Sequence, residues 1–282
     1  MAVSFTRIHH VGVVVRSLKT AYPFWRDTLQ LAVSKTAMVP DQGVSAALLP
    51  CGESEIELLE PVNPSGGVAK FLEKRGEGLH HLCFQTDDVA SALADAGARG
   101  LPLIDKTPRK GLAGMIGFLH PKAGHGTLVE YATPFPEDAP PASHPPHGPF
   151  RRLHTAAIAV NDVDAAARTF GANFDLGCAH RTEDEARGAR VAFLPIGRSV
   201  IALMAPAGST PAGLIAARLS EGGEGLFLIG LEVSDFAGAV KRLEGAGLRV
   251  TRTRSAEGID VGLVGPQGTN GVPIEFYARP VS

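Results

Sequence analysis

The sequence predicts an α+β protein made of four β-α-β-β-β modules, two in each of two tandem domains. Three observations lead to this prediction: an internal repeat with an offset of about 145 residues, a β-α-β-β-β pattern that occurs twice in each half, and a proline-rich stretch between the halves. In such a fold, each domain is expected to form a cupped, mixed β-sheet flanked by helices.

The length and composition are typical of a two-domain globular protein. The 282 residues are 44% hydrophobic and 20% charged, with a formal net charge of −2, and a single core rarely grows beyond about 250–300 residues. A charge near zero argues against a nucleic-acid partner, and no apolar run approaches the roughly 20 residues that span a bilayer. The N-terminus has no basic region or cleavage site of a signal peptide. Because three scattered cysteines provide no disulfide framework, we expect a reducing, cytoplasmic location.

Matching segments in the two halves establish the repeat. ALLPCGESEIELLEP (47–61) matches AFLPIGRSVIALMAP (192–206), and GFLHPKAGHGTLVEY (117–131) matches GLVGPQGTNGVPIEF (262–276). The offset is 145 in both pairs, and it is 147 between RGEGLHHLCFQTDD and GGEGLFLIGLEVSD. Small insertions between well-matched blocks indicate the duplication of a whole domain.

The boundary between the domains is set by proline. Residues 133–149 read TPFPEDAPPASHPPHGP, with seven prolines and no apolar periodicity, so this stretch is expected to be a semi-rigid linker. We therefore predict one domain over 1–132, a linker over 133–150 and a second domain over 151–282.

The first module begins with the apolar strand 6–15. Helical spacing of Leu18, Tyr22, Trp25 and Leu29 predicts a helix over 17–29, although Pro23 disfavours its first turn. Apolar alternation then predicts three strands. They span 31–38, 43–50 and 53–61.

The second module repeats this order after a short connecting helix at 67–75, whose counterpart in the second half is 211–220. A strand is predicted at 79–86 and a helix at 88–99. Three further strands are predicted at 102–105, 113–120 and 126–132.

Period-two alternation places one metal-ligand residue from the first and last strands of each module on a common face. These residues are His10 and Glu57 in the first module and His81 and Glu130 in the second. Two imidazoles and two carboxylates suit a divalent ion of octahedral preference, with two positions left for water or substrate. A structural zinc site would instead be closed and tetrahedral.

Several segments of the first half carry a resemblance to a known family. They are IHHVGVVV, PDQGVSAALL, EIELLEP, AKFLEKRGEGLHHLCFQTDD and GFLHPKAGHGTLVEY. Through them the chain resembles the vicinal oxygen chelate superfamily, which contains glyoxalases, bleomycin resistance proteins and dioxygenases. The first 132 residues resemble methylmalonyl-CoA epimerase in particular.

This resemblance implies a metal-dependent epimerase of a 2-substituted malonyl-CoA-like thioester. His10, Glu57, His81 and Glu130 match the family's ligands for one divalent ion, which could be Co, Mn, Ni, Zn, Fe or Mg. An acyl-CoA would be the small-molecule substrate, and a metal-stabilised enolate the intermediate. Glu57 and Glu130 are the leading acid and base. Some family members carry a further Glu where this chain has Ala46, so a second, non-ligand base is not identified.

The second half lacks the same ligand set. The positions that match His10, Glu57, His81 and Glu130 are Thr155, Ala202, Leu228 and Glu275. We therefore predict no metal site in the second domain. This domain is interpreted as a stand-in for the second subunit of a single-domain homodimer, so the chain would be an internal pseudo-dimer. Further homodimerisation of the chain stays open.

Other functions remain open. A glyoxalase-type isomerase would use the same two-carboxylate site, and another lyase or a dioxygenase of the superfamily is a further alternative. A dioxygenase needs two His, one carboxylate and open positions, one of which Glu57 would fill. A small-molecule-binding or resistance protein is an alternative of another class, although a hydrophobic trap needs no metal.

Other polar residues are given a less specific role. His9 and His80 fall on the face opposite to the predicted ligands and are interpreted as packing residues. Cys83 is interpreted as a buried, inert thiol. The basic residues Lys106, Arg109 and Lys110 could either contact CoA phosphates or form a solvated loop. His144 and His147 are assigned to the solvated linker.

Overall fold

The computed structural model of the chain describes residues 4–138, 146–184, 187–207, 213–255 and 258–278. Part of the predicted linker, residues 139–145 with His144, lies outside the described residues. The predicted helix at 211–220 begins outside them too, and its described part is α5 (Leu214–Gly222). His147 is described and is exposed to solvent, as expected for the linker.

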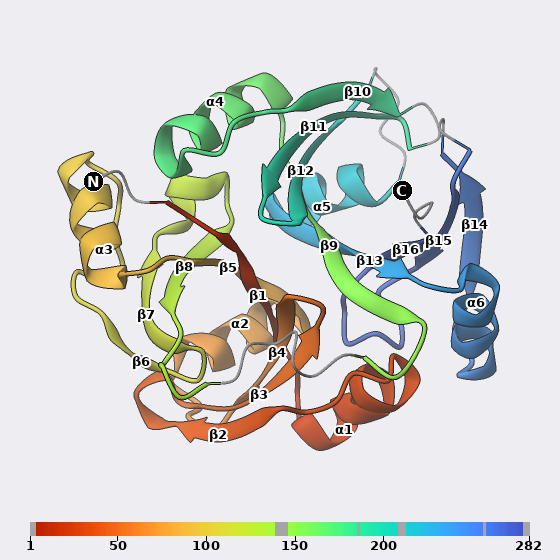
Figure 1. The fold of residues 1–282 in the computed structure, drawn as a ribbon, viewed down its shortest axis with the longest axis horizontal. Helices are drawn as coiled ribbons and strands as arrows, with labels where there is room; N and C mark the ends of the chain where they lie inside the picture. The colour runs from red at the N-terminus through yellow and green to blue at the C-terminus, as the bar shows by residue number, and fades with distance from the viewer. Residues whose placement is uncertain (1–3, 139–145, 185–186, 208–212, 256–257, 279–282) are drawn as a thin grey trace. The chain divides into compact units, whose positions relative to one another are not determined.

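The fold consists of two eight-stranded mixed sheets, one from each half of the chain, as predicted (Figure 1). The first sheet has the order β2-β3-β4-β1-β5-β8-β7-β6, and the second has the order β10-β11-β12-β9-β13-β16-β15-β14. The two orders are the same after a shift of eight strands, so the sequence repeat is also a repeat of topology.

Each sheet is formed by eight strands of one half of the chain. The strands of the first sheet are β1 (Arg7–Val14), β2 (Lys35–Val39), β3 (Val44–Cys51), β4 (Ser54–Pro61), β5 (Gly78–Gln85), β6 (Arg109–Gly111), β7 (Gly114–Leu119) and β8 (Leu128–Thr133). Those of the second sheet are β9 (Phe150–Ala159), β10 (His180–Asp184), β11 (Ala189–Ile196), β12 (Ser199–Pro206), β13 (Gly225–Val233), β14 (Val250–Arg254), β15 (Asp260–Val264) and β16 (Ile274–Tyr277).

A capped helix follows the first strand of each module. The four helices are α1 (Leu18–Tyr22), α3 (Val89–Ala98), α4 (Val163–Phe174) and α6 (Phe236–Gly245). Their N-caps are Ser17, Asp88, Asp162 and Asp235, and each cap side chain accepts a hydrogen bond from a backbone N–H of the first turn. Such caps satisfy donors that the helix itself leaves unpaired. The same local signal therefore ends the strand and starts the helix four times.

The connecting helix predicted at 67–75 is α2 (Gly67–Arg75), with the same bounds. None of the helices in the described segments has the length and apolarity that a membrane span requires.

The first helix departs from the prediction at Pro23. Instead of one α-helix over 17–29, α1 ends at Tyr22 and a π-helix, η1, spans Pro23–Thr28. The Leu29 N–H donates to the Phe24 carbonyl, five residues back, at 2.9 Å. Because Pro23 has no N–H and its ring crowds the preceding turn, it disrupts the regular α-helical ladder here.

The strand predicted at 102–105 was wrong. Leu103 makes only an isolated bridge to Leu119, and the strand beside β7 is β6. The Ile104 and Asp105 N–H groups both donate to the single carbonyl of Phe118. Two donors on one carbonyl turn the chain away from a strand ladder, so pairing resumes only at Arg109.

Contacts divide the chain into two compact units, and each unit takes modules from both halves. The first unit contains Met1–His9, His81–Pro136 and Thr155–Phe227. Inside it, the rings of Phe84 and Phe174 lie 5.5 Å apart, edge to face. A residue of the first half thus packs in one core with a residue of the second.

The second unit contains His10–His80, Glu137–His154 and Leu228–Ser282. Inside it, the Trp25 indole N–H donates to the Asn270 side-chain oxygen at 3.1 Å, and Trp25 is fully buried. This unit also joins the first half to the second.

Candidate metal centre

The strands β1 and β4 place His10 and Glu57 on one face. They run parallel, with Gly12 opposite Glu57, so His10 lies two residues away on the same side of the sheet as Glu57. Both side chains are buried, and His10 Nε2 lies 3.4 Å from Glu57 Oε2. A carboxylate inside the apolar run EIELLEP is costly unless it has such a partner. The local pair is the one that alternation predicted.

The strands β5 and β8 place His81 and Glu130 on one face. They also run parallel, with Cys83 opposite Glu130 and His81 two residues before Cys83. His81 and Glu130 are buried, and His81 Nε2 lies 3.3 Å from Glu130 Oε2. Each module thus supplies one buried His–Glu pair from its two parallel strands.

The face that carries His81 and Glu130 also carries an apolar cluster, and we call it the ligand face. Cys83, Ile116, Phe118 and Ala132 form a buried cluster on it, with Leu128 packed against them. The His81 ring meets Phe118 edge to face, with centroids 5.4 Å apart. In such a low-dielectric setting, electrostatic interactions are stronger than in water. As predicted, the Cys83 thiol is a buried part of this apolar surface.

The opposite side of β7 is covered by α3. A side chain on Gly117 would meet Leu93 of that helix, whereas the adjacent residues Ile116 and Phe118 belong to the ligand face. Helix and ligand face therefore lie on opposite sides of this part of the sheet.

Each contact unit holds one buried His–Glu pair whose side chains could bind a metal ion. The pair His10–Glu57 lies in the second unit, and the pair His81–Glu130 lies in the first. Imidazole and carboxylate are donors that divalent transition metals accept.

The donor geometry fits a divalent ion. Two ligands at about 2.1 Å from an ion and at right angles to each other are separated by about 3 Å. The His–Glu separations of 3.3 and 3.4 Å are close to this value, and they are longer than the 2.7–2.9 Å that is typical of a charge-assisted hydrogen bond.

The matching positions of the second half have the same registers, and only Glu275 keeps the side chain of its counterpart, Glu130. Ala202 stands opposite Ala157 and Glu275 opposite Gly230, just as Glu57 stands opposite Gly12 and Glu130 opposite Cys83. Ala202 and Leu228 are buried apolar residues. The sheet was retained in this half, while the positions that match Glu57 and His81 cannot bind a metal.

Ala46 lies on the same side of the sheet as Glu57. Ala46 is on β3 and stands opposite Leu59 of β4, which is two positions from Glu57. Ala46 is fully buried. A methyl group at this place can neither accept nor donate a proton. Glu55, also buried and on the same side as Glu57, is a further carboxylate of this strand.

The three basic residues at 106–110 differ in their exposure to solvent. Lys106 and Lys110 are exposed, whereas Arg109 is half-buried and lies over the ring of Phe118, 5.4 Å from its centroid. Sequence reasoning grouped these three residues and missed this difference. The signal that could have separated them is the alternation of β6, which places Arg109 opposite Ile116 of the ligand face.

His80 packs as predicted, edge to face with Phe71 at 5.0 Å. His9 is buried, as expected for a packing residue.

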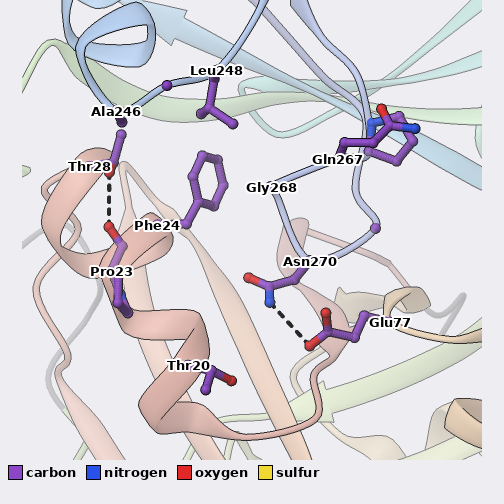
Figure 2. Close-up of a pocket in the computed structure, with 13 residues that line it drawn as sticks. Thr20, Pro23, Phe24, Thr28, Glu77, Ala246, Leu248, Gln267, Gly268 and Asn270 are labelled. Atoms are coloured by element: carbon purple, nitrogen blue, oxygen red, sulfur yellow. Dashed lines mark hydrogen bonds between the residues drawn. The ribbon is translucent and has the colours of Figure 1, made fainter.

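A cavity of about 600 Å³ lies elsewhere, in the second unit (Figure 2). Its lining includes Phe24, Glu77, Leu248 and Asn270, and none of the four predicted ligands. The Asn270 side-chain amide donates to Glu77 at 3.1 Å, and Figure 2 shows this hydrogen bond as a dashed line. This cavity is separate from the two His–Glu pairs.

Comparison with known proteins identifies the class to which this fold and these His–Glu pairs belong. The family model of the Glyoxalase/Bleomycin resistance protein/Dioxygenase superfamily matches residues 9–118 and again 154–263. The chain therefore belongs to this superfamily, with one copy of its domain in each half.

More specific similarities concern the first half. The chain is 37% identical over 129 residues to the ethylmalonyl-CoA/methylmalonyl-CoA epimerase of Cereibacter sphaeroides, which covers 44% of this chain and 95% of that protein. It is 34% identical over 126 residues to the mitochondrial methylmalonyl-CoA epimerase of Mus musculus, covering 44% of this chain and 71% of that protein.

One solved structure matches nearly the whole chain. It is a mutant of 4-hydroxymandelate synthase from Streptomyces coelicolor, with a TM-score of 0.74 and 19% sequence identity, covering 98% of this chain and 93% of that one. At this identity, the likeness shows that the tandem fold is shared.

Proposed function

We propose that the protein is a metal-dependent epimerase of a 2-substituted malonyl-CoA-like thioester. The observation that carries this proposal is the presence of two buried His–Glu pairs, His10–Glu57 and His81–Glu130, in the half that resembles methylmalonyl-CoA epimerases. Membership of an enzyme-containing superfamily and epimerase relatives at 34–37% identity support it.

In this proposal, His10, Glu57, His81 and Glu130 hold one divalent ion. When bound, the ion would supply a Lewis acid to the thioester carbonyl and so lower the energy of the enolate that forms when the α-proton leaves. The apolar cluster of the ligand face excludes water around His81 and strengthens this electrostatic stabilisation.

The proton is moved by carboxylates of the same site. Epimerisation removes the α-proton on one face of the substrate and returns a proton on the other, which needs two groups. Glu130 is assigned to one face of the substrate and Glu57 to the other, because each is the carboxylate of a different His–Glu pair. Ala46 stands where some relatives carry a further Glu, so the ligand carboxylates take this role here.

The second half is proposed to replace the second subunit of a single-domain homodimer. Each contact unit contains modules of both halves, so the second half completes cores that the first half does not complete alone. In the first unit, for example, Phe84 packs against Phe174.

An Fe(II)-dependent oxygenase is the second candidate. The two predicted His ligands and one of the two predicted carboxylates, His10, His81 and Glu130, would make a two-His-one-carboxylate set of the kind that such enzymes use. Glu57 distinguishes the two candidates. In an epimerase it is a fourth ligand, whereas an oxygenase needs that position for substrate or oxygen.

The decisive experiment measures exchange of the α-proton with solvent. Chelator-treated protein is reloaded with one divalent metal at a time and incubated in D₂O with methylmalonyl-CoA, ethylmalonyl-CoA or propionyl-CoA. An epimerase incorporates deuterium at the α-carbon without net chemistry, and chelator abolishes the exchange. Absence of exchange with every metal and thioester contradicts the proposal, and metal-dependent oxygen uptake would favour the second candidate.

A further inference from the structure

Arg109 lies on the ligand face, three strands away from His81. Its register partner is Ile116 on β7, and Phe118 on the same side of β7 stands opposite Glu130 on β8. Since cross-strand partners share a face of the sheet, Arg109 points to the side that carries the second His–Glu pair. The segment 106–110 therefore contributes one cation to the ligand face and leaves its two lysines in solvent.

Two ring contacts connect Arg109 to the predicted ligand His81. The guanidinium carbon lies 5.4 Å from the centroid of Phe118, and Phe118 meets the His81 ring at 5.4 Å. A guanidinium over an aromatic face is held by a cation–π interaction. Phe118 thus contacts both the cation and the His81 ring.

Asp105 fixes the other side of the guanidinium. Arg109 Nε donates to the two carboxylate oxygens of Asp105 at 3.3 and 3.2 Å. The carboxylate in turn accepts a hydrogen bond from the Phe118 backbone N–H at 3.0 Å. Asp105 is therefore a positioning residue that holds the cation and the ring beneath it in one arrangement.

One nitrogen of the guanidinium lacks a hydrogen-bond partner among the described residues. This nitrogen is Arg109 Nη1, and it is buried. A buried donor without an acceptor costs free energy, and an arginine fork is well suited to a carboxylate. The arrangement provides an anion-binding donor at the edge of the site.

We propose that Arg109 binds the carboxylate of the substrate's acyl group and so selects a dicarboxylic acyl thioester over a monocarboxylic one. This inference rests on the proposed function. The carboxylate is favoured over a CoA phosphate because the donor is buried on the ligand face, beside the ring that contacts His81, whereas Lys106 and Lys110 are in solvent.

The second half contains a matched arginine in a different setting. Arg254 follows Arg109 by 145 residues, which is the repeat offset. Its side chain is 68% exposed and pairs with Asp260 at 3.0 Å, whereas the Arg109 side chain is 30% exposed. The position that matches Phe118 is Leu263, which offers no ring. Arg254 therefore provides a control for the removal of an arginine.

The test measures binding without catalysis. Isothermal titration calorimetry of the metal-loaded protein compares malonyl-CoA, propionyl-CoA and malonyl-pantetheine, which keeps the carboxylate and lacks all phosphates. Arg109→Met is expected to weaken malonyl-CoA and malonyl-pantetheine binding by about 10-fold or more, as loss of a charged hydrogen bond predicts. Propionyl-CoA binding should change less than twofold. Arg109→Lys should restore only part of the affinity, and Arg254→Met should bind like the parent.

The outcomes separate this inference from the proposed function. Equal weakening of propionyl-CoA, no effect of Arg109→Met, or a parent protein that does not prefer malonyl-CoA would each overturn the role of Arg109. Weakening that disappears with malonyl-pantetheine would assign Arg109 to a phosphate and overturn the carboxylate assignment. If the expected affinities are found but no thioester exchanges its α-proton, the epimerase proposal fails while Arg109 keeps its role as the carboxylate-binding group. Circular dichroism of Arg109→Met confirms that the variant is folded.

Discussion

His125 contacts Glu224, and a matching contact joins the residues at the equivalent positions of the repeat. His125 Nδ1 lies 2.9 Å from Glu224 Oε2, and Asn270 Nδ2 donates to Glu77 Oε1 at 3.1 Å. Asn270 follows His125 by 145 residues, and Glu224 follows Glu77 by 147. One contact lies in each contact unit, and each links the first half of the chain to the second.

The backbone around these contacts is also repeated. His125 and Asn270 both have a left-handed conformation, with φ of 49° and 52°. Glu224 Oε1 accepts from the Asn161 N–H at 2.7 Å, and Glu77 Oε1 accepts from the Arg16 N–H at 2.8 Å. Each Glu therefore joins the end of a first strand to a loop of a module from the other half.

The first prediction concerns Gly126, the residue that follows His125. Gly126 has φ of 77°, and a side chain there would collide with the backbone oxygen of Glu224. Gly126→Ala should combine the conformational cost of about 1–2 kcal/mol with about 1–3 kcal/mol of steric strain. Gly100→Ala is the control, since Gly100 has a similar φ of 76° and nothing within 4 Å. Urea unfolding that gives equal losses for both variants would contradict the close approach.

A second prediction concerns the first half by itself. A fragment of residues 1–138 removes Glu224 from His125 and Phe174 from Phe84. The surfaces that these residues cover would become exposed, and an exposed apolar patch favours association. We expect the fragment to aggregate or self-associate in sedimentation velocity experiments. A monodisperse, folded monomer would show that the modules of the second half are dispensable.

The third prediction concerns metal content. If only the first half binds an ion, chelator-stripped and reloaded protein should contain about one divalent ion per chain by elemental analysis. His81→Ala should lose most of this metal, while His147→Ala, at an exposed position, should retain it. A content near two, or metal retained by His81→Ala at parental affinity, would be inconsistent with the predicted ligand set.

The fourth prediction separates ligation from proton transfer. Glu130→Gln and Glu57→Gln are compared at saturating metal, with Glu275→Gln as the matched control in the second half. If a carboxylate moves the substrate proton, its variant should retain metal yet lose α-proton exchange by about 100- to 10,000-fold. If it only ligates, added metal should restore exchange. Parental exchange by both variants at saturating metal would exclude the two-carboxylate mechanism.

The fifth prediction concerns acid stability. The Ser91 hydroxyl and the Ala90 N–H donate to Asp88 and hold the pKa of that carboxyl below its ordinary value. Its contribution to stability is therefore complete above an unfolded-state pKa of about 3.9 and is lost as the pH falls through the lower folded-state pKa. Asp88→Asn keeps a good N-cap that does not titrate.

The free energies of unfolding of the parent and of Asp88→Asn should thus differ by a constant amount above about pH 5. Below about pH 4, the parent should lose stability relative to Asp88→Asn. Asp162→Asn should behave alike, because the Ala165 N–H lowers the pKa of Asp162. Parallel stability curves from pH 7 to pH 3 would show that the caps do not titrate as expected.

The sequence by itself determined the repeated elements and the faces of the strands. The bounds of α2 agree with the prediction at both ends, and His10 shares a face with Glu57 as alternation requires. These features depend on local signals: a cap residue such as Asp88, a proline or glycine at an end, and the two-residue period of a strand. The duplication added a comparison in which the first half carries all four predicted ligands and the second half keeps only Glu275.

Only the tertiary structure decided which distant residues meet. It placed β6 at Arg109 instead of at 102–105, it set Arg109 over Phe118, and it joined Trp25 to Asn270. These contacts depend on the order and register of the strands and on the pairing of modules from different halves. A period of two residues states which side a residue faces, but it carries no information on which strand or loop lies beside it.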